Sequence, residues 1–250
     1  MYNKIHIQWS DKISNYLFYA IGLAFLIASS IVFINIDIHN INVDRWSVIS
    51  SFWEAAFNGE YPYFASSHMG NNPGPMPFYF LLALPFYLIN ELGYFSLLGL
   101  VILVYLMRKM NTSINYKLVM LIFMITSAFY LWEVVTRSNI FTTTVLILWF
   151  LFSFSYRKKD SVLFFYLSAI LAGFLLSTRA VFIIPYIIFF MYGFLKKEIS
   201  LARLLIYAMI AFVVFISTFL PFMIFFPDKF FEMNPLIIQS SFFVPSYFTV

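Results

Sequence analysis

Four charged residues of this chain have types suited to group-transfer chemistry. Asp37 and Asp44 carry carboxylates that can accept a proton, and Arg137 and Arg179 carry planar guanidinium groups that match the geometry of a phosphate. Each type also has an ordinary structural interpretation, because an aspartate is a suitable helix N-cap and an arginine beside an apolar helix extends its charge to the membrane surface. The elements around these residues decide between the two interpretations.

The composition of the chain excludes an ordinary water-soluble domain. Of its 250 residues, 62% are hydrophobic and only 10% are charged, whereas about a quarter of the residues of a soluble domain are charged. The charges fall in short clusters between long apolar runs, which predicts a single domain, residues 1–250, in a lipid bilayer. Because the positive residues behind the net charge of +4 lie at the ends of these runs, we expect no nucleic-acid partner.

Seven apolar runs predict an all-α fold, a polytopic bundle of about seven transmembrane helices. The first run, between Lys12 and Asp37, is long enough to cross about 30 Å of hydrocarbon. It is too long for the core of a signal peptide, so we interpret it as a retained anchor. The other runs lie between Glu91 and Arg108, Lys117 and Glu133, Arg137 and Arg157, Asp160 and Arg179, Arg179 and Lys196, and Arg203 and Asp228.

The uncharged stretch from Tyr61 to Asn90 does not predict another span. Its first half is rich in proline, with Pro62, Pro73, Pro75 and Pro77. A regular helix does not tolerate this density of proline. Only residues 77–90 are apolar throughout, and this short piece suits a re-entrant or interfacial segment.

The positive residues predict the orientation. If the stretch 61–90 does not cross, most of the 15 lysines and arginines share one side: Lys4, Lys12, Arg108, Lys109, Lys117, Arg157, Lys158, Lys159, Lys196, Lys197 and Arg203. The positive-inside rule makes that side cytoplasmic. We therefore expect a cytoplasmic amino terminus, an extracytoplasmic loop over residues 37–92, an extracytoplasmic carboxyl end and a location in the plasma (inner) membrane.

An amphipathic helix is predicted within the loop 37–92. Apolar residues recur at helical spacing on one face, at Val48, Ile49, Phe52, Trp53 and Ala56. The other face is polar and holds Asp44, Ser47, Ser51, Glu54 and Asn58. Because a transmembrane helix precedes it and it carries tryptophan, this helix should lie in the membrane interface.

Several short motifs follow one another in an order that is typical of one family. They are Asp44 shortly after the first span, Gly59, Tyr61-Pro62-Tyr63, and the proline-rich entry Asn72-Pro73-Gly74-Pro75-Met76-Pro77. Weaker motifs are Glu133 with Arg137-Ser138-Asn139 in a later outer loop, and Ser177-Thr178-Arg179 after the fifth span. In this order the chain resembles the polytopic GT-C glycosyltransferases, in particular the protein O-mannosyltransferases and the lipid A aminoarabinose transferases. The family often has a lysine where this chain has Asn72.

The resemblance implies a reaction and roles for particular residues. Family members transfer a sugar from a polyprenyl-phosphate donor to an acceptor on the outer face of the membrane. Asp44 is then the expected general base, with Asp37 as second choice, and Arg137 and Arg179 are expected to hold the donor phosphate. The expected substrate-binding residues are Glu133, Asn139, Tyr61, Tyr63, His68 and Asn72. Family members usually continue beyond this module, so we expect a minimal member or one incomplete at its carboxyl end.

Other interpretations stay open on the sequence. Glu133 and Arg137 have the spacing of a structural helical pair, and tyrosines at this depth commonly form an aromatic belt. A transporter or flippase of lipid-linked sugars should show internal repeats or broken helices in matching halves, and the sequence shows neither. A non-catalytic assembly partner would keep the helices and lose the outer site. No cofactor and no metal are expected, because the chain lacks cysteine and its loop histidines lack further ligands.

Overall fold

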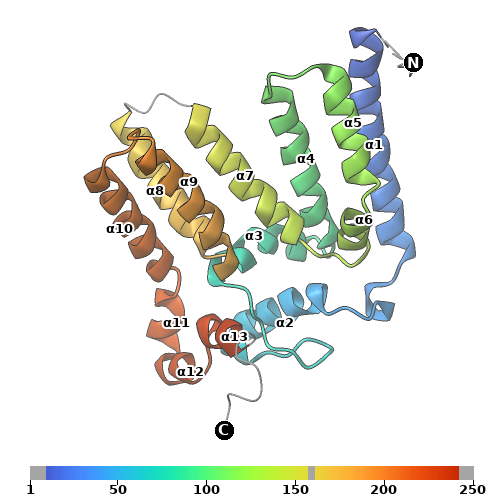
Figure 1. The fold of residues 1–250 in the computed structure, drawn as a ribbon. Helices are drawn as coiled ribbons and strands as arrows, with labels where there is room; N and C mark the ends of the chain where they lie inside the picture. Colours follow the sequence, from blue (N-terminus) through green and yellow to red (C-terminus); the bar gives the residue numbers. More distant parts are fainter. Residues whose placement is uncertain (1–9, 157–160, 242–250) are drawn as a thin grey trace.

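The computed structural model describes residues 10–156 and 161–241, and within these ranges the chain forms helices and no strand. Every predicted apolar run contains a helix. The longer helices stand side by side in Figure 1: α1 (Asp11–Asn35), α4 (Gly93–Lys109), α5 (Ile114–Ile125), α7 (Ile140–Tyr156), α8 (Val162–Leu176), α9 (Ile183–Leu195) and α10 (Leu201–Ser217). Lys4 and the positive cluster 157–159 lie outside the described residues.

The shorter elements gather at one end of these helices (Figure 1). They are η1 (Ile38–Asn40), α2 (Arg45–Phe57), η2 (Pro62–Phe64), α3 (Pro77–Leu88), α6 (Ala128–Val135), η3 (Ala180–Phe182), α11 (Leu220–Phe225), α12 (Pro227–Glu232) and α13 (Pro235–Ser241). This end therefore contains the loop 37–92, in which the sequence predicts the site.

The apolar helices indicate a membrane protein with at least one candidate span. By length and composition α1 can cross a membrane by itself, and up to three spans result if two bent helix pairs each count as one. The pairs are α3 with α4, bent by 110°, and α5 with α6, bent by 56°. The sequence predicts that residues 77–90 and the run after Glu91 are separate elements, as they are in the first pair. It predicts one helix for the run from Lys117 to Glu133, which the second pair divides. The count of seven spans stays a prediction.

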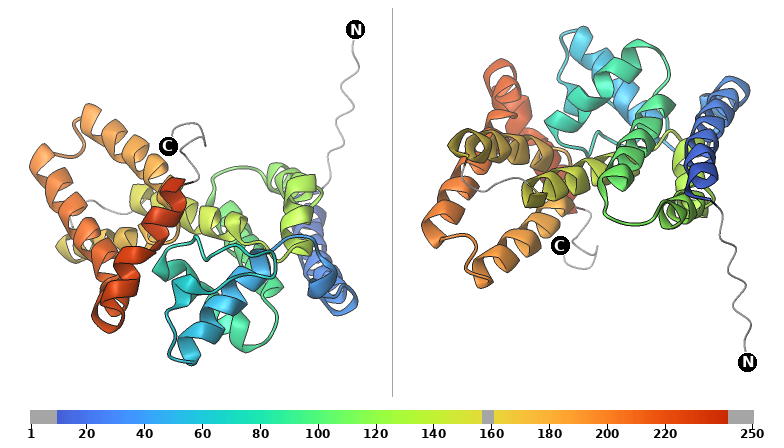
Figure 2. Two further views of the ribbon diagram at one scale, coloured as in Figure 1. Left: turned by 90° about the horizontal axis from the view of Figure 1, so that it is seen from below. Right: turned by 90° about the horizontal axis from the view of Figure 1, so that it is seen from above.

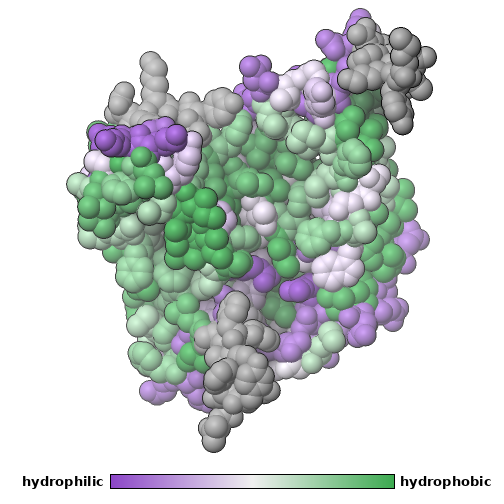
Figure 3. Space-filling model, in the orientation of Figure 1, coloured by the Kyte–Doolittle hydropathy of each residue, from purple (hydrophilic) through white to green (hydrophobic). Residues whose placement is uncertain are grey.

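The surface of the long helices is strongly apolar. Side chains such as Ile27, Phe123 and Phe212 are 54%, 73% and 61% exposed. Figure 3 shows hydrophobic residues over the middle of the molecule and hydrophilic residues toward its upper and lower edges. An exposed apolar surface of this extent marks contact with lipid or with another protein.

Three buried clusters hold the helices together. One joins α1, α4, α5 and α6, a second joins α7 to α10, and the third packs α2 and α3 against α12 and the end of α10. Both views in Figure 2 show α8, α9 and α10 grouped on one side and α1, α4 and α5 on the other, with α7 between them. Small residues permit the closest helix contacts, as at Gly99 beside α7.

Helix α2 forms where it was predicted, but its buried face is rotated from the predicted one. Ile49 and Phe52 are buried as expected. Trp46 and Ala55, which were not assigned to the apolar face, are buried as well. Ser47, predicted to be on the polar face, is only 5% exposed. Its hydroxyl donates to the backbone oxygen of Asp44 (3.1 Å) and lies 2.7 Å from Nδ1 of His68, so its burial leaves no polar group unpaired.

Replacing Gly99 by alanine tests the tight packing of α4 on α7. A Cβ at this position would lie 2.8 Å from the Cα of Thr142, and overpacking of this kind costs about 1–3 kcal/mol. Gly22→Ala is the matched control, because the nearest atom to its Cβ would be 3.9 Å away and alanine is favoured over glycine inside a helix. Thermal unfolding in detergent should show a lower midpoint for Gly99→Ala alone. Equal midpoints for the two variants would contradict the close α4–α7 contact.

Candidate functional site

A polar cavity of about 440 Å³ lies where the start of α2 meets the segment between α8 and α9. Its walls also include the loop that leads into α3, and Gln239 of α13. The lining residues are Asp44, Arg45, Val48, Asn71, Asn72, Gly74, Pro75, Tyr79, Arg179, Ala180, Val181 and Gln239. The fold thus brings three predicted site residues together, Asp44, Arg179 and Asn72, from distant parts of the chain.

The carboxylate of Asp44 is held at one oxygen and free at the other. Asp44 occupies the N-cap position of α2, yet its side chain forms no capping hydrogen bond. Instead, Oδ2 accepts hydrogen bonds from Ser67 Oγ (3.0 Å) and Asn71 Nδ2 (2.7 Å). No donor among the described residues bonds to Oδ1. The carboxylate is therefore oriented by two donors and keeps one oxygen available for a ligand proton.

A tight turn presents the two donors to Asp44. The backbone N–H of Ser67 donates to the oxygen of Asn71 (2.9 Å), and the N–H of Gly70 donates to the oxygen of Ser67 (2.9 Å). Gly70 has φ +81°, a left-handed conformation that glycine adopts without strain. The donors at Ser67 and Asn71 are thus fixed by the turn and not by Asp44 itself.

Two arginines give the cavity a net positive charge. The guanidinium carbon of Arg179 lies 5.3 Å from the centre of the Tyr79 ring, and its buried Nε has no hydrogen-bond acceptor. Arg45 is the second cation, and the described residues offer neither arginine an ion pair. A buried donor without a partner is unfavourable by about 1–3 kcal/mol, so this arrangement favours an anionic ligand such as a phosphate.

Tyr79 links the cavity wall to α7. Its hydroxyl donates to Oδ1 of Asn139, which is 1% exposed. A phenol is protonated at neutral pH, so the Tyr79 hydroxyl acts here as a hydrogen-bond donor.

Backbone hydrogen bonds fix Arg179 relative to the loop before α3. Met76 N donates to the oxygen of Thr178 (3.1 Å), and Tyr79 N donates to the oxygen of Ser177 (3.3 Å). The side chain of Gln239 also links the two segments, since its Nε2 donates to the oxygen of Gly74 (2.6 Å) and its Oε1 accepts from Ala180 N (3.2 Å). Hydrogen bonds thus join the three segments that form this part of the cavity wall: the loop before α3, the segment after α8, and α13.

Arg137 does not line this cavity, so it is separated from Arg179, with which it was expected to hold the donor phosphate. Its guanidinium is 1% exposed and forms an ion pair with Glu91 (Nε to Oε1, 3.3 Å). It also donates to the backbone oxygens of Phe33 (3.1 Å), Ile36 (3.0 Å) and Val135 (2.8 Å). Because its donors are occupied by the protein, Arg137 has the geometry of a structural residue.

Glu133 and Asn139 are likewise buried away from the cavity lining. Glu133 is 0% exposed and accepts from Ser138 Oγ (2.6 Å) and Phe141 N (3.0 Å), so its carboxylate caps the start of α7. The helical pair of Glu133 with Arg137 does not form, since the partner of Arg137 is Glu91. Asn139 reaches the cavity only through Tyr79.

The tyrosines of the Tyr-Pro-Tyr motif, which the resemblance predicts to bind substrate, are core residues in the structure. Tyr61 and Tyr63 are 2% and 0% exposed and pack against Phe222. Their hydroxyls donate to the backbone oxygens of Met233 (2.6 Å) and Pro75 (3.4 Å). No ring face of these residues is open to a sugar.

Of the other predicted residues, Asn72 lines the cavity, and Asp37 and His68 do not. Asp37 caps η1 by accepting from His39 N (2.9 Å) and does not line the cavity. The ring of His68 stacks on Trp46 with centroids 5.4 Å apart. Asn72 lines the cavity, while its Nδ2 donates to the oxygen of Ala65 (3.1 Å).

Sequence reasoning missed several residues that shape the site: Arg45, Ser67, Asn71, Tyr79 and Gln239. Arg45 directly follows Asp44, and a search for cations beside the candidate base could have found it. The others depend on chain reversals that no local pattern reveals.

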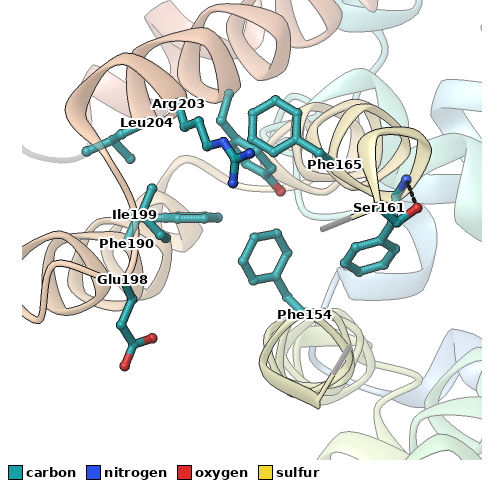
Figure 4. Close-up of a pocket in the computed structure, with 10 residues that line it drawn as sticks. Phe154, Ser161, Phe165, Phe190, Glu198, Ile199, Arg203 and Leu204 are labelled. Atoms are coloured by element: carbon teal, nitrogen blue, oxygen red, sulfur yellow. Dashed lines mark hydrogen bonds between the residues drawn. The ribbon is translucent and has the colours of Figure 1, made fainter. Parts of the chain in front are cut away.

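A larger apolar cavity adjoins the polar one. It has a volume of about 570 Å³, lies between α8, α9 and α10, and shares Ala180 with the polar cavity. Its wall includes small residues, among them Ala172, Ala208 and Ala211. A third cavity, at the opposite end of α8, has room for only about 40 Å³ between aromatic rings such as Phe154 and Phe190 (Figure 4). The first two cavities are large enough for a substrate, and this third one is not.

No family model, curated protein or solved structure matches this chain. The described residues also contain no group of three histidine, aspartate or glutamate side chains placed to hold a metal ion. The geometry of the polar cavity therefore carries the functional argument by itself.

The separation of the two arginines predicts different effects on stability. Arg137→Gln breaks the ion pair with the half-buried Glu91 and leaves the backbone oxygens of Phe33 and Ile36 without their donor, and each buried group left unsatisfied costs about 1–3 kcal/mol. Arg179→Gln removes a cation that has no ion pair in the protein, so the unfolding midpoint should stay near that of the parent. Thermal unfolding of both variants in the same detergent checks this. A midpoint for Arg137→Gln equal to that of Arg179→Gln would contradict the structural role of Arg137.

Proposed function

We propose that this chain is a membrane glycosyltransferase that moves a sugar from a polyprenyl-phosphate donor to an acceptor on the extracytoplasmic side. The observation that carries the proposal is the shared cavity of Asp44 and Arg179, with Arg45 beside them. A base with a free oxygen and unpaired cations are the two features that this transfer requires.

In the proposed reaction, Oδ1 of Asp44 takes the proton of an acceptor hydroxyl. The acceptor oxygen then forms a bond to the anomeric carbon of the sugar. The bond from that carbon to the donor phosphate oxygen breaks, and its electron pair leaves with the phosphate. Arg45 and Arg179 stabilise the charge that develops on the leaving group. Ser67 and Asn71 hold the carboxylate in one orientation throughout.

The apolar cavity supports a donor that is linked to a lipid. It adjoins the polar cavity at Ala180, on the side of Arg179. A ligand whose phosphate lies at Arg179 has an apolar space of about 570 Å³ next to it for the first part of a hydrocarbon tail. An amphiphilic donor fits this pair of cavities better than a nucleotide sugar, which has no apolar tail.

A flippase or transporter of lipid-linked sugars is the second candidate. The two bent helix pairs favour it, because discontinuous helices are common at transporter binding sites. Such a protein would hold the same ligand without breaking the bond to phosphate. A non-catalytic assembly partner would bind neither substrate.

The seven-span topology is part of the proposal and predicts where tags lie. Because most lysines and arginines share one side in this topology, a tag inserted after Tyr156 should be cytoplasmic and a tag after Val250 extracytoplasmic. The reactivity of tagged cells with an impermeant label measures both positions. The reverse pattern would put the Asp44 cavity in the cytoplasm and contradict the proposed reaction with an outer acceptor.

Replacement of Asp44 by asparagine tests the proposed base. The amide keeps the size of the side chain and can accept a hydrogen bond at one oxygen, but it cannot take the acceptor proton. Transfer from polyprenyl-phosphate-linked hexoses and pentoses should fall by about 100-fold or more, the scale of lost general-base catalysis, while donor binding and the unfolding midpoint stay near those of the parent.

Asp37→Asn is the matched control, since Asp37 lies in the same loop but outside the cavity. Its turnover should equal that of the parent. Transfer by Asp44→Asn within a few-fold of the parent would exclude the proposed base. If the parent binds donors and transfers no sugar, the flippase becomes the better interpretation.

A further inference from the structure

A second polar cavity, of about 380 Å³, lies along the opposite face of α2. Trp46, Ser50 and Glu54 line it, and they recur every four residues along one stripe of the helix. Asp44 and Arg45, which line the first cavity, project from the other side of the helix at about 100° per residue. The remaining walls come from η1, the turn between α3 and α4, and Arg137. The two cavities are thus separate, with α2 between them.

This second cavity presents carboxylate oxygens that no protein donor satisfies. Oε1 of Glu91 accepts from Gly93 N (2.7 Å) and from Arg137 Nε (3.3 Å), whereas Oε2 has no donor among the described residues. The carboxylate of Glu54 is exposed and accepts no hydrogen bond from the described residues. Since the charge of Arg137 is already paired with Glu91, the cavity offers free acceptors and a net negative charge.

Aromatic rings and one unpaired donor complete the wall. Trp46 is only 8% exposed, and its indole N–H is buried without an acceptor. The ring of Trp46 meets that of His39 edge-on, with centroids 4.9 Å apart, and Tyr87 lines the cavity as well. A buried N–H without a partner is rare in folded proteins, and it favours a ligand atom that can accept a hydrogen bond.

The chemistry of these groups selects the ligand. An ammonium ion would satisfy the two carboxylates but has no lone pair for the indole N–H. A phosphate would accept from the indole but would face Glu54 and Glu91. A hydroxyl group accepts from one side and donates to the other, and a sugar ring carries several of them beside apolar faces that pack on aromatic rings.

We propose that this second cavity is a saccharide-binding site, distinct from the Asp44 cavity. In it, Glu54 and Glu91 accept hydrogen bonds from sugar hydroxyls, and Trp46 donates one to a sugar oxygen. The inference goes beyond the proposed transferase reaction, because it depends on the residues of this cavity and not on Asp44.

Ligand binding to the purified chain in nanodiscs tests the site, without any detergent that carries a sugar head group. The probes are methyl α-D-mannopyranoside, methyl β-D-glucopyranoside and methyl β-D-galactopyranoside, with ethanolamine as the ammonium probe. Saturation-transfer NMR should show saturable binding of at least one glycoside at about millimolar concentration. Glu54→Ala, at an exposed position that should fold, should weaken it about tenfold, as the loss of a hydrogen bond to a charged group does. Trp46→Phe, which keeps a ring and removes the donor, should also weaken it.

Two control variants locate the bound sugar. Glu60→Ala removes an exposed carboxylate that lies outside the cavity and should leave binding unchanged. Asp44→Asn should also leave it unchanged, which separates this site from the proposed transferase site. The inference is overturned if no glycoside binds saturably, if ethanolamine alone binds, or if Asp44→Asn abolishes binding that Glu54→Ala retains.

Discussion

The buried guanidinium of Arg137 is the constraint on which the arrangement of the outer elements depends. It joins the end of α1, through Phe33 and Ile36, to the α3–α4 turn, through Glu91, and to the end of α6, through Val135. An unpaired charge at this depth would be strongly unfavourable, so all three segments must stay in place around it. Because only the short η1 and its flanking residues separate α1 from α2, this junction also sets where the chain enters the helix between the two cavities.

The elements that could be predicted from the sequence are those specified by apolar length and charge. Each apolar run contains a helix because a long uncharged segment in lipid must satisfy its backbone hydrogen bonds internally. The bend of 56° between α5 and α6 was not predictable from hydropathy, since Thr126 and Ser127 interrupt an apolar run without adding charge. Thr126 Oγ1 instead donates to the oxygen of Ile122 (2.7 Å), one turn earlier.

The candidate site could be predicted only in part, because spacing identifies residue types and not their partners. Asp44 and Arg179 were found and do share a cavity. Arg137 has the same side chain as Arg179 and a similar position after an apolar run, yet its donors are used by the protein. The two arginines differ in what surrounds them: three backbone oxygens and a carboxylate in one case, and a tyrosine ring in the other. Only tertiary structure supplies that difference.

Helix α2 differs from a simple interfacial helix in a way that connects the two cavities. A helix that rests on a membrane needs one polar face, but α2 has polar residues on two opposite sides, at Asp44 and Arg45 and at Ser50 and Glu54. Its buried stripe runs between them through Ile49 and Phe52, onto the side chains of α3. The hydroxyl of Ser47 contacts both the backbone of Asp44 and the ring of His68, which stacks on Trp46. The wall of the second cavity is therefore in direct contact with the turn that holds the Asp44 carboxylate.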